Sequence, residues 1–306
     1  MKSEYLVAGI SIINDIHYAD DRISKNNLGG CAIFAYGGIG LFTDNVTLIT
    51  TGGEDFLNYY GHYFDENQID KDGIYYDLPY THHTVLKYEK DGKWSERSIY
   101  GDDYFTLQSE NNRTSLKKLE PFLSVHSKGL YLDSSADEKI FDEIKEIRDK
   151  APNIKIMWEP PTFSTKDDSV HEKIINNLKK VDYYSMNLDE ASFFFKSEER
   201  EILIRKIMEL GVPCFLREGE KGSSWIEDGK CVSLNAYKPE KATDVTGCGN
   251  CSAASALYWR IEGKDYEDIV LYANIAAGYN AAFKGPAPIK AGRDEKIDQK
   301  MKEYYH

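Results

Sequence analysis

The sequence predicts an α/β fold in which helices cover both faces of a mostly parallel sheet. Two observations carry this prediction. Short apolar runs alternate with amphipathic runs between residues 129 and 216, and this order is typical of parallel strands joined by crossover helices. The 306 residues also contain no repeat and no linker rich in proline or serine. We therefore expect one domain over residues 1–306.

Each expected element rests on its apolar pattern. Runs of consecutive apolar or β-branched residues predict strands, and apolar residues at helical spacing, such as Ile140, Ile144 and Ile147, predict helices. The expected strands cover residues 5–13, 46–51, 129–132, 154–158, 181–186 and 212–216. The expected helices cover residues 31–42, 55–68, 136–150, 170–180, 189–195 and 202–210, with a further one from residue 251. Ligands of such sheets bind beyond the carboxyl ends of the strands, so functional residues should follow strands directly.

Residues 84–100 follow a different pattern. Asp91-Gly92 lies between two strand-like runs, and this dipeptide predicts a two-residue hairpin turn because both positions tolerate positive φ. The flanking runs are rich in Lys, Glu and Arg. We therefore expect a projecting hairpin rather than a central strand.

Charge and cysteine content exclude several classes of protein. Lys and Arg number 38 against 51 Asp and Glu, which gives a net charge of −13. Such an acidic surface repels phosphate backbones, so we expect no nucleic-acid partner. No apolar stretch is long enough to span a membrane, and residues 5–13 read as a buried strand rather than a signal peptide. An odd count of five cysteines predicts free thiols and a cytoplasmic protein.

The glycine-rich segment 243–250 carries the strongest chemical signal. Gly247 and Gly249 flank Cys248, and a run of small residues suited to a helix follows from Cys251. The backbone N–H groups of such a turn converge, and the positive end of the helix points at the same place. The segment therefore predicts an anion hole suited to phosphate. A glycine-rich helix cap without a ligand is the alternative.

The same segment resembles a signature of the ribokinase-like (PfkB) family of carbohydrate and nucleoside kinases. Asp244-Val-Thr-Gly247-Cys-Gly249-Asn250 stands where that family has Asp-Thr-x-Gly-Ala-Gly-Asp. Other segments resemble the family's motifs in the expected order, over roughly residues 5 to 290. They are Gly29-Gly30 before a helix, Thr51-Gly-Gly-Glu-Asp55, Asn187-Leu-Asp-Glu190, Gly219-Glu-Lys221-Gly222 and the small-residue helix Asn274–Ala282.

This resemblance implies a fold and an activity. The fold would be a three-layer α/β/α sandwich with a small β-sheet lid, formed by about residues 14–28 and 81–104. The activity would be ATP-dependent transfer of phosphate to a hydroxyl of a sugar or a nucleoside-like small molecule. ATP, Mg²⁺ and K⁺ would be the cofactors. The lid often makes the dimer contact in this family, which implies a homodimer.

The resemblance also implies roles for the matching residues. Gly247, Cys248 and Gly249 would hold the transferring phosphate. Asn187, Glu190, Gly219, Lys221, Gly222 and Asn274 would line the nucleotide site. Glu190 would hold Mg²⁺ through water, and Asp244 and Thr246 would lie at a monovalent-cation site. An ordinary helix N-cap is the alternative for Asn187 and Glu190, and a surface turn is the alternative for residues 219–222.

The sequence departs from the family pattern at the acceptor end. Asn250 replaces the Asp that serves as catalytic base, and an amide cannot take up a proton near neutral pH. Phe34 replaces an Asn expected to bind sugar, although a phenyl ring can stack on a sugar face. The expected acceptor site therefore comprises Asn14 or Asp15, Gly29, Gly30, Phe34 and Arg97.

Three functional hypotheses follow. The first is a kinase of an unusual sugar or sugar-like alcohol, in which Asn250 orients the hydroxyl. The second is a catalytically weak binding or regulatory protein that keeps the nucleotide site. The third is a thiol redox protein that uses Cys248 and Cys251, which form a C-x-x-C motif.

Overall fold

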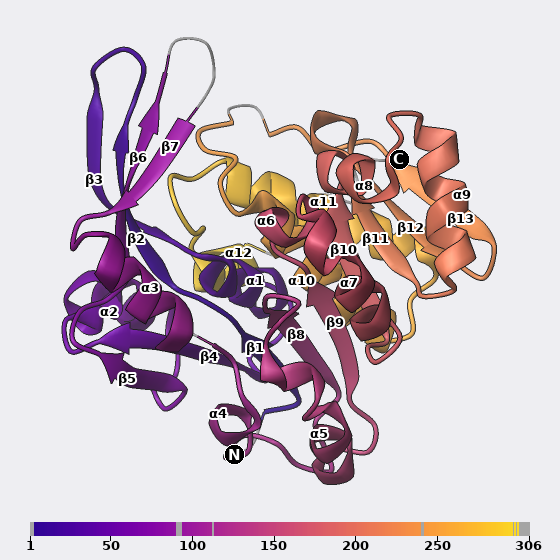
Figure 1. The fold of residues 1–306 in the computed structure, drawn as a ribbon, viewed down its shortest axis with the longest axis horizontal. Coiled ribbons are helices and arrows are strands. Elements are labelled where there is room, and N and C mark those ends of the chain that lie inside the picture. Colours follow the sequence, from indigo (N-terminus) through magenta and orange to yellow (C-terminus); the bar gives the residue numbers. More distant parts are fainter. Residues whose placement is uncertain are drawn as a thin grey trace.

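The computed structural model describes residues 3–89, 94–111, 113–239 and 242–295, together with residues 297 and 299. Two sheets occur in this part of the chain (Figure 1). The large sheet has the order β13-β12-β11-β10-β9-β8-β1-β4-β5. Its strands are β1 (Tyr5–Ala8), β4 (Val46–Gly53), β5 (Ile74–Leu78), β8 (Gly129–Asp133), β9 (Lys155–Glu159), β10 (Tyr183–Asn187), β11 (Cys214–Arg217), β12 (Ser223–Glu227) and β13 (Lys230–Leu234).

Helices cover both faces of this sheet, as the sequence predicts (Figure 1). They are α1 (Cys31–Gly40), α2 (Phe56–Asn67), α3 (Asp102–Asn111), α4 (Leu116–Leu119), α5 (Ile144–Lys150), α6 (Thr162–Thr165), α7 (His171–Leu178), α8 (Leu188–Phe195), α9 (Arg200–Leu210), α10 (Cys248–Ile261), α11 (Tyr266–Ala281) and α12 (Ile289–Asp294). No helix among the described residues is both long and apolar enough to cross a bilayer.

The large sheet separates two hydrophobic cores because side chains alternate along each strand. In β1, Tyr5 and Val7 face the core that α1, α2, α10 and α11 cover. Leu6 and Ala8 face the other core, which α5, α7, α8 and α9 cover. From β5 to β11 in spatial order, all neighbouring strands pair in parallel. The β11–β12 and β12–β13 pairs are antiparallel. The carboxyl ends of the parallel strands therefore share one edge.

The small sheet projects from the body of the molecule and contains the predicted hairpin (Figure 1). Its strands are β3 (Ile23–Gly29), β2 (Ile12–His17), β6 (His83–Tyr88) and β7 (Trp94–Ser98), in that spatial order. The Tyr60 hydroxyl on α2 donates to the carbonyls of Ile12 and Gly29, at 2.9 and 2.8 Å. This buried tyrosine fixes the base of the small sheet to the body. The predicted turn at Asp91-Gly92 lies outside the described residues.

The structure corrects two expected elements. The expected strand 5–13 divides after Ala8, because the chain bends at residues 9–11 and continues into the small sheet as β2. Gly30 makes the bend possible, since a side chain there would meet the Ile10 carbonyl. The expected helix 136–150 is a short 3₁₀ turn at 139–141 followed by α5. Its apolar face is nevertheless buried, because Ile140, Ile144 and Ile147 all lie in the core.

Candidate functional site

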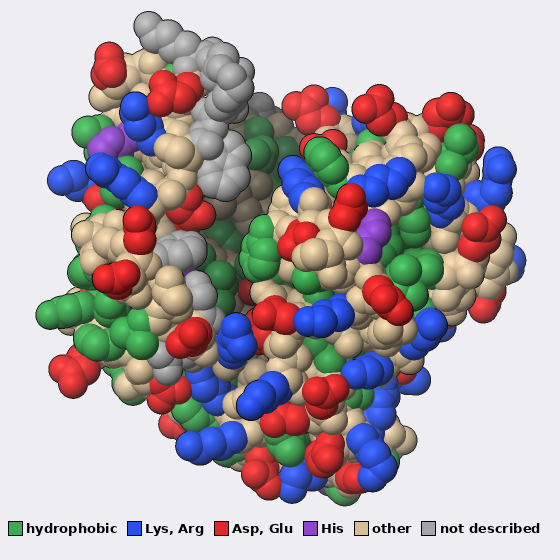
Figure 2. Space-filling model, viewed as in Figure 1, with side chains coloured by type: hydrophobic (Ala, Val, Ile, Leu, Met, Phe, Trp, Pro, Cys, Tyr) green, Lys and Arg blue, Asp and Glu red, His purple; other side chains and the backbone are tan. Residues whose placement is uncertain are grey.

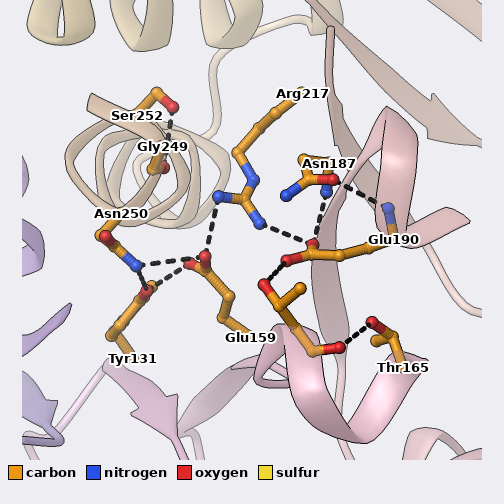
Figure 3. A network of polar contacts seen from close by, with 10 residues as sticks. Tyr131, Glu159, Thr165, Asn187, Glu190, Arg217, Gly249, Asn250 and Ser252 are labelled. Carbon is orange, nitrogen blue, oxygen red and sulfur yellow. Dashed lines mark hydrogen bonds and ion pairs between the residues drawn. The ribbon is translucent and has the colours of Figure 1, made fainter. Parts of the chain in front are cut away.

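Charged side chains converge where the parallel strands end and α10 begins. β9 ends at Glu159, β11 ends at Arg217, and α8 follows β10 and carries Glu190. Asn250 lies in the first turn of α10 and points toward Glu159 (Figure 3). Figure 2 shows that this face of the molecule is hollowed between the small sheet and the body. This edge is where a doubly covered parallel sheet is expected to bind ligands.

Arg217 joins two of these carboxylates. Its Nη1 lies 2.8 Å from Glu159 Oε1, and its Nη2 lies 3.2 Å from Glu190 Oε2. The Arg217 side chain is only 12% exposed. Burial alone would lower the pKa of Arg217, but Glu159 and Glu190 outweigh it and raise that pKa above its usual value. The guanidinium is therefore a permanent positive charge between two buried acids.

Glu159 is the centre of the cluster. Besides the Arg217 ion pair, it accepts hydrogen bonds from the Tyr131 hydroxyl and from Asn250 Nδ2, the latter at 3.1 Å. The same Nδ2 lies 3.3 Å from the Tyr131 hydroxyl (Figure 3). Burial raises the pKa of Glu159, and the Arg217 guanidinium opposes that rise.

Asp133 adds a third carboxyl at the end of β8. It is 9% exposed and accepts a weak hydrogen bond of 3.4 Å from the Ile10 backbone. Burial, with a contribution from the nearby Glu159 charge, raises its pKa to about 7. The Asp133 carboxyl therefore holds its proton more strongly than an exposed aspartic acid does.

The turn at 247–249 has the conformation that the glycine pattern predicts. Gly247 has a φ of +73°, which places it in the left-handed region, and it is the N-cap of α10. No side chain caps this helix. Within the described chain, no group accepts from the backbone N–H of Gly249 or Asn250. The first turn of α10 therefore keeps free donors for an anion.

Both glycines of the turn also accommodate close neighbours within the protein. A Cβ at Gly247 would lie 1.9 Å from the Phe34 ring, and one at Gly249 would lie 2.3 Å from Arg217 Nη1. Phe34 is 2% exposed. Its ring lies against the turn instead of presenting an open face for stacking on a sugar.

Asn187 and Glu190 form a capping box at the start of α8. Asn187 Oδ1 accepts the Glu190 N–H at 2.8 Å, and Glu190 Oε2 accepts the Asn187 N–H at 2.7 Å. Glu190 Oε1 accepts the Thr162 hydroxyl at 2.6 Å. Glu190 thus accepts three hydrogen bonds including that of Arg217, and it is 3% exposed. The binding of Mg²⁺ through water at Glu190 stays a prediction.

The other expected nucleotide residues lie in the turn between β11 and β12 and on α11 beside it. Gly219 and Lys221 are exposed in a 3₁₀ turn after β11. Gly222 is buried, and a side chain there would meet the Leu234 carbonyl. Asn274 is 5% exposed and binds Ser223 and the carbonyls of Leu234 and Asn235. Its polar groups join α11 to β12 and β13.

The expected acceptor residues gather in the small sheet and at its base. Asn14 is buried and accepts the Thr84 hydroxyl at 2.9 Å. Asp15 accepts the Asn26 N–H at 2.8 Å and lies 3.2 Å from His83 Nε2. Gly29 and Gly30 lie where β3 meets α1, and Arg97 is exposed on β7. Among the described residues, no hydrogen bond or ion pair joins Arg97 to Asn250 or Arg217.

Asp244 and Thr246, the expected cation ligands, shape the loop before α10. Asp244 accepts the backbone N–H groups of Thr246 at 2.9 Å and of Gly285 at 3.2 Å. The Thr246 carbonyl accepts from Asn280 Nδ2 at 3.0 Å. Their binding of K⁺ stays a prediction.

The thiol redox hypothesis is wrong, because the surroundings of Cys248 and Cys251 favour the protonated thiol. Cys251 is 2% exposed, and its thiol lies 3.5 Å from the Ala276 carbonyl. The Cys248 thiol lies 3.3 Å from the Ala277 carbonyl. Burial raises the pKa of both thiols, so neither is the thiolate that redox exchange needs.

Glu159, Tyr131 and Asp133 are absent from the sequence-based site. Glu159 and Asp133 each follow an expected strand directly, so an inspection of every strand end would have found both. Tyr131 lies within an apolar run and gives no comparable signal. The meeting of Arg217 with Glu159 depends on the pairing of strands that are far apart in sequence.

Comparisons with known proteins agree with this architecture. The family model described as pfkB family carbohydrate kinase matches residues 18–289. No curated protein sequence matches the chain. Among solved structures, the chain is similar to the nucleoside kinase of Methanocaldococcus jannaschii, at 18% identity and a TM-score of 0.71, with 99% of both chains covered.

Two further structures show the same fold. One is an adenosine kinase from Sinorhizobium meliloti, at 18% identity and a TM-score of 0.74, with 98% of this chain and 100% of that chain covered. The other is an Arabidopsis thaliana ribokinase solved with ribose and ATP, at 18% identity and a TM-score of 0.72, with 98% and 99% covered. The fold is thus ribokinase-like, and the chain belongs to the pfkB family of carbohydrate kinases.

Proposed function

We propose that this protein transfers the terminal phosphate of ATP to a hydroxyl of a sugar or nucleoside-like small molecule. The observation that carries the proposal is the uncapped first turn of α10, which lies beside Glu159 and Arg217 at the strand ends. Donors of this kind stabilise the charge that develops on a transferring phosphoryl group. Membership of a carbohydrate kinase family supports an acceptor of this kind.

The reaction forms one bond and breaks another. The acceptor hydroxyl oxygen bonds to the γ-phosphorus, the bond from that phosphorus to the β,γ-bridging oxygen breaks, and ADP leaves. Asn250 cannot take the hydroxyl proton, so the proton passes to water. Asn250 Oδ1 accepts no hydrogen bond from the described residues, and it is therefore able to orient the hydroxyl.

Phosphoryl transfer by this route depends on positioning and charge rather than on a strong base. General-base help contributes roughly 10²- to 10⁴-fold, and the transition state is loose. Glu190 would hold Mg²⁺ through water, and the ion would offset the negative charge of the ATP phosphates. We also propose that K⁺ binds at Asp244 and Thr246, so that the transfer rate depends on K⁺.

The small sheet is proposed as the lid over the acceptor and as the contact of a homodimer. Ile23, Tyr88 and Ile99 support this, because these apolar residues on or beside its strands are 55%, 39% and 45% exposed. A cytoplasmic location is proposed because all five cysteines are free.

A transfer assay tests the activity. Radiolabelled ATP is offered with a panel of sugars, polyols and nucleosides, with and without Mg²⁺ and K⁺, and the product is separated from free phosphate. We expect transfer to at least one acceptor, and Asn250→Ala should reduce it. The matched control is Asn58→Ala, which alters an exposed amide on α2. ATP binding without transfer to any acceptor would support a regulatory binding protein and contradict the proposal.

A further inference from the structure

The side-chain amide of Asn250 is held in one orientation. Its Nδ2 lies 3.1 Å from Glu159 Oε1 and 3.3 Å from the Tyr131 hydroxyl, and that hydroxyl itself donates to Glu159 (Figure 3). A carboxylate can only accept hydrogen bonds. The alternative rotamer would place the amide oxygen against Glu159, which is 7% exposed, and two acceptors in contact repel each other.

We propose that Glu159 is a positioning residue that turns Asn250 so that its Oδ1 faces outward as a hydrogen-bond acceptor. The site thus carries its carboxylate on β9 and its acceptor amide on α10. An aspartate at position 250 would bring two carboxylates within about the same 3.1 Å that now separates the Asn250 amide from Glu159. Glu159 and Asn250 are therefore a matched pair, and Glu159 is incompatible with an ionised acid at position 250.

The surroundings of Glu159 do not offset a second negative charge. The charged and titratable groups facing it are Arg217 on β11, Glu190 on α8, Tyr131 and Asp133 on β8, and Cys31 on α1. Among these groups only Arg217 is positively charged, and it also forms an ion pair with Glu190. Two carboxylates in such a place share one proton, which raises the apparent pKa of the pair.

The test is a comparison of Asn250→Asp, Glu159→Gln and the double variant by thermal unfolding between pH 5 and pH 8. A raised pKa in the folded state means that stability falls as pH rises through that interval. We expect the Tm of Asn250→Asp to fall by about 5 °C or more relative to wild type between pH 5 and pH 8. The double variant should follow the wild-type curve, because the glutamine amide donates to the new aspartate.

A second double variant controls for nonspecific loss of a buried acid. Glu227 forms an ion pair with Arg260 at the other end of β12 and is 9% exposed. Glu227→Gln combined with Asn250→Asp should keep the pH-dependent fall in Tm. The proposal is overturned if Asn250→Asp melts in parallel with wild type, or if Glu159→Gln fails to restore its pH dependence. An Asn250→Asp protein that is unfolded even at pH 5, with no rescue by Glu159→Gln, also overturns it.

A phosphate-transfer assay tests the effect of the Glu159–Asn250 pair on catalysis, which rests on the proposed function. At pH 7, Asn250→Asp with Glu159→Gln should transfer phosphate at least about 10-fold faster than wild type, because position 250 then holds an ionised base. Asn250→Asp alone should show no such gain at pH 7. Absence of transfer in every protein contradicts the kinase proposal, whereas the melting curves still decide the role of Glu159.

Discussion

Replacing Arg217 with methionine removes the only guanidinium that contacts both Glu159 and Glu190 in the described part of the site. Methionine keeps much of the side-chain volume but leaves two buried carboxylates without their cation. At an effective dielectric constant of about 20, charges 2.8 and 3.2 Å apart attract by roughly 6 and 5 kcal/mol. The cost of desolvating Arg217 offsets part of this attraction, and breaking such buried pairs costs about 3–5 kcal/mol in practice.

The assay is urea unfolding followed by fluorescence, since Trp158 and Trp225 are fully buried. At pH 7.5 we expect Arg217→Met to lower the free energy of unfolding by about 3–5 kcal/mol. Without the guanidinium, the pKa of Glu159 in the folded state rises further. A carboxyl group with a raised pKa in the folded state lowers stability as the pH rises above about 4.3, the pKa of Glu in the unfolded chain. The loss of stability caused by Arg217→Met should therefore be smaller at pH 5 than at pH 7.5.

A surface pair supplies the control. Arg22 lies 2.7 Å from Asp20, but the two side chains are 73% and 57% exposed. Arg22→Met should change stability little at either pH, because exposed pairs are screened by solvent. A loss below about 1 kcal/mol for Arg217→Met, or a loss of equal size at pH 5 and pH 7.5, would refute the view that Arg217 is the essential counterion of this cluster.

Three further changes test neighbouring parts of the site. Burial raises the folded-state pKa of Asp133 to about 7. Wild type should therefore lose up to about 4 kcal/mol of stability through this group as the pH rises from 4 to 8. Urea unfolding of Asp133→Asn should show a weaker dependence of stability on pH over this interval. Gly247→Ala should lower the free energy of unfolding by at least about 2 kcal/mol, as measured by thermal unfolding. Adding Phe34→Leu to this variant should restore only part of the lost stability, because an alanine at a φ of +73° remains strained. Asn187→Ala should destabilise by about 1 kcal/mol through loss of the capping box, and no change in Tm would contradict the cap.

The alternating pattern between residues 129 and 216 was sufficient to predict β8, β9, β10 and β11, because buried parallel strands are nearly continuous apolar runs. The parallel strand β5 (Ile74–Leu78) was not predicted. The pattern was also insufficient for β12 and β13, whose sequences mix polar and apolar residues. Yet Asp228 and Gly229 between them have φ values of 53° and 71°. They form the kind of Asp-Gly turn that predicts the hairpin at residues 91–92, so the signal was present in the sequence.

The candidate site was predictable only in part, for a physical reason. The glycine turn and the start of α8 are local features, set by residues that are neighbours in sequence. The cluster of Glu159, Arg217 and Asn250 joins three elements that only the sheet order brings together. A charged residue at the end of an apolar run marks a strand end, but its partner depends on which strands become neighbours.

The two glycines of the turn have a structural role as well as a proposed chemical one. Their spacing favours a phosphate cradle, but Gly247 is also required by the Phe34 ring and Gly249 by the Arg217 guanidinium. With its positive φ, Gly247 would be needed even if no phosphate ever bound, and Gly249 leaves room for the Arg217 guanidinium. Their presence is therefore not independent support for phosphate binding. That support comes from the uncapped N–H groups of Gly249 and Asn250, which the described chain leaves without an acceptor although buried and half-buried backbone donors are normally paired.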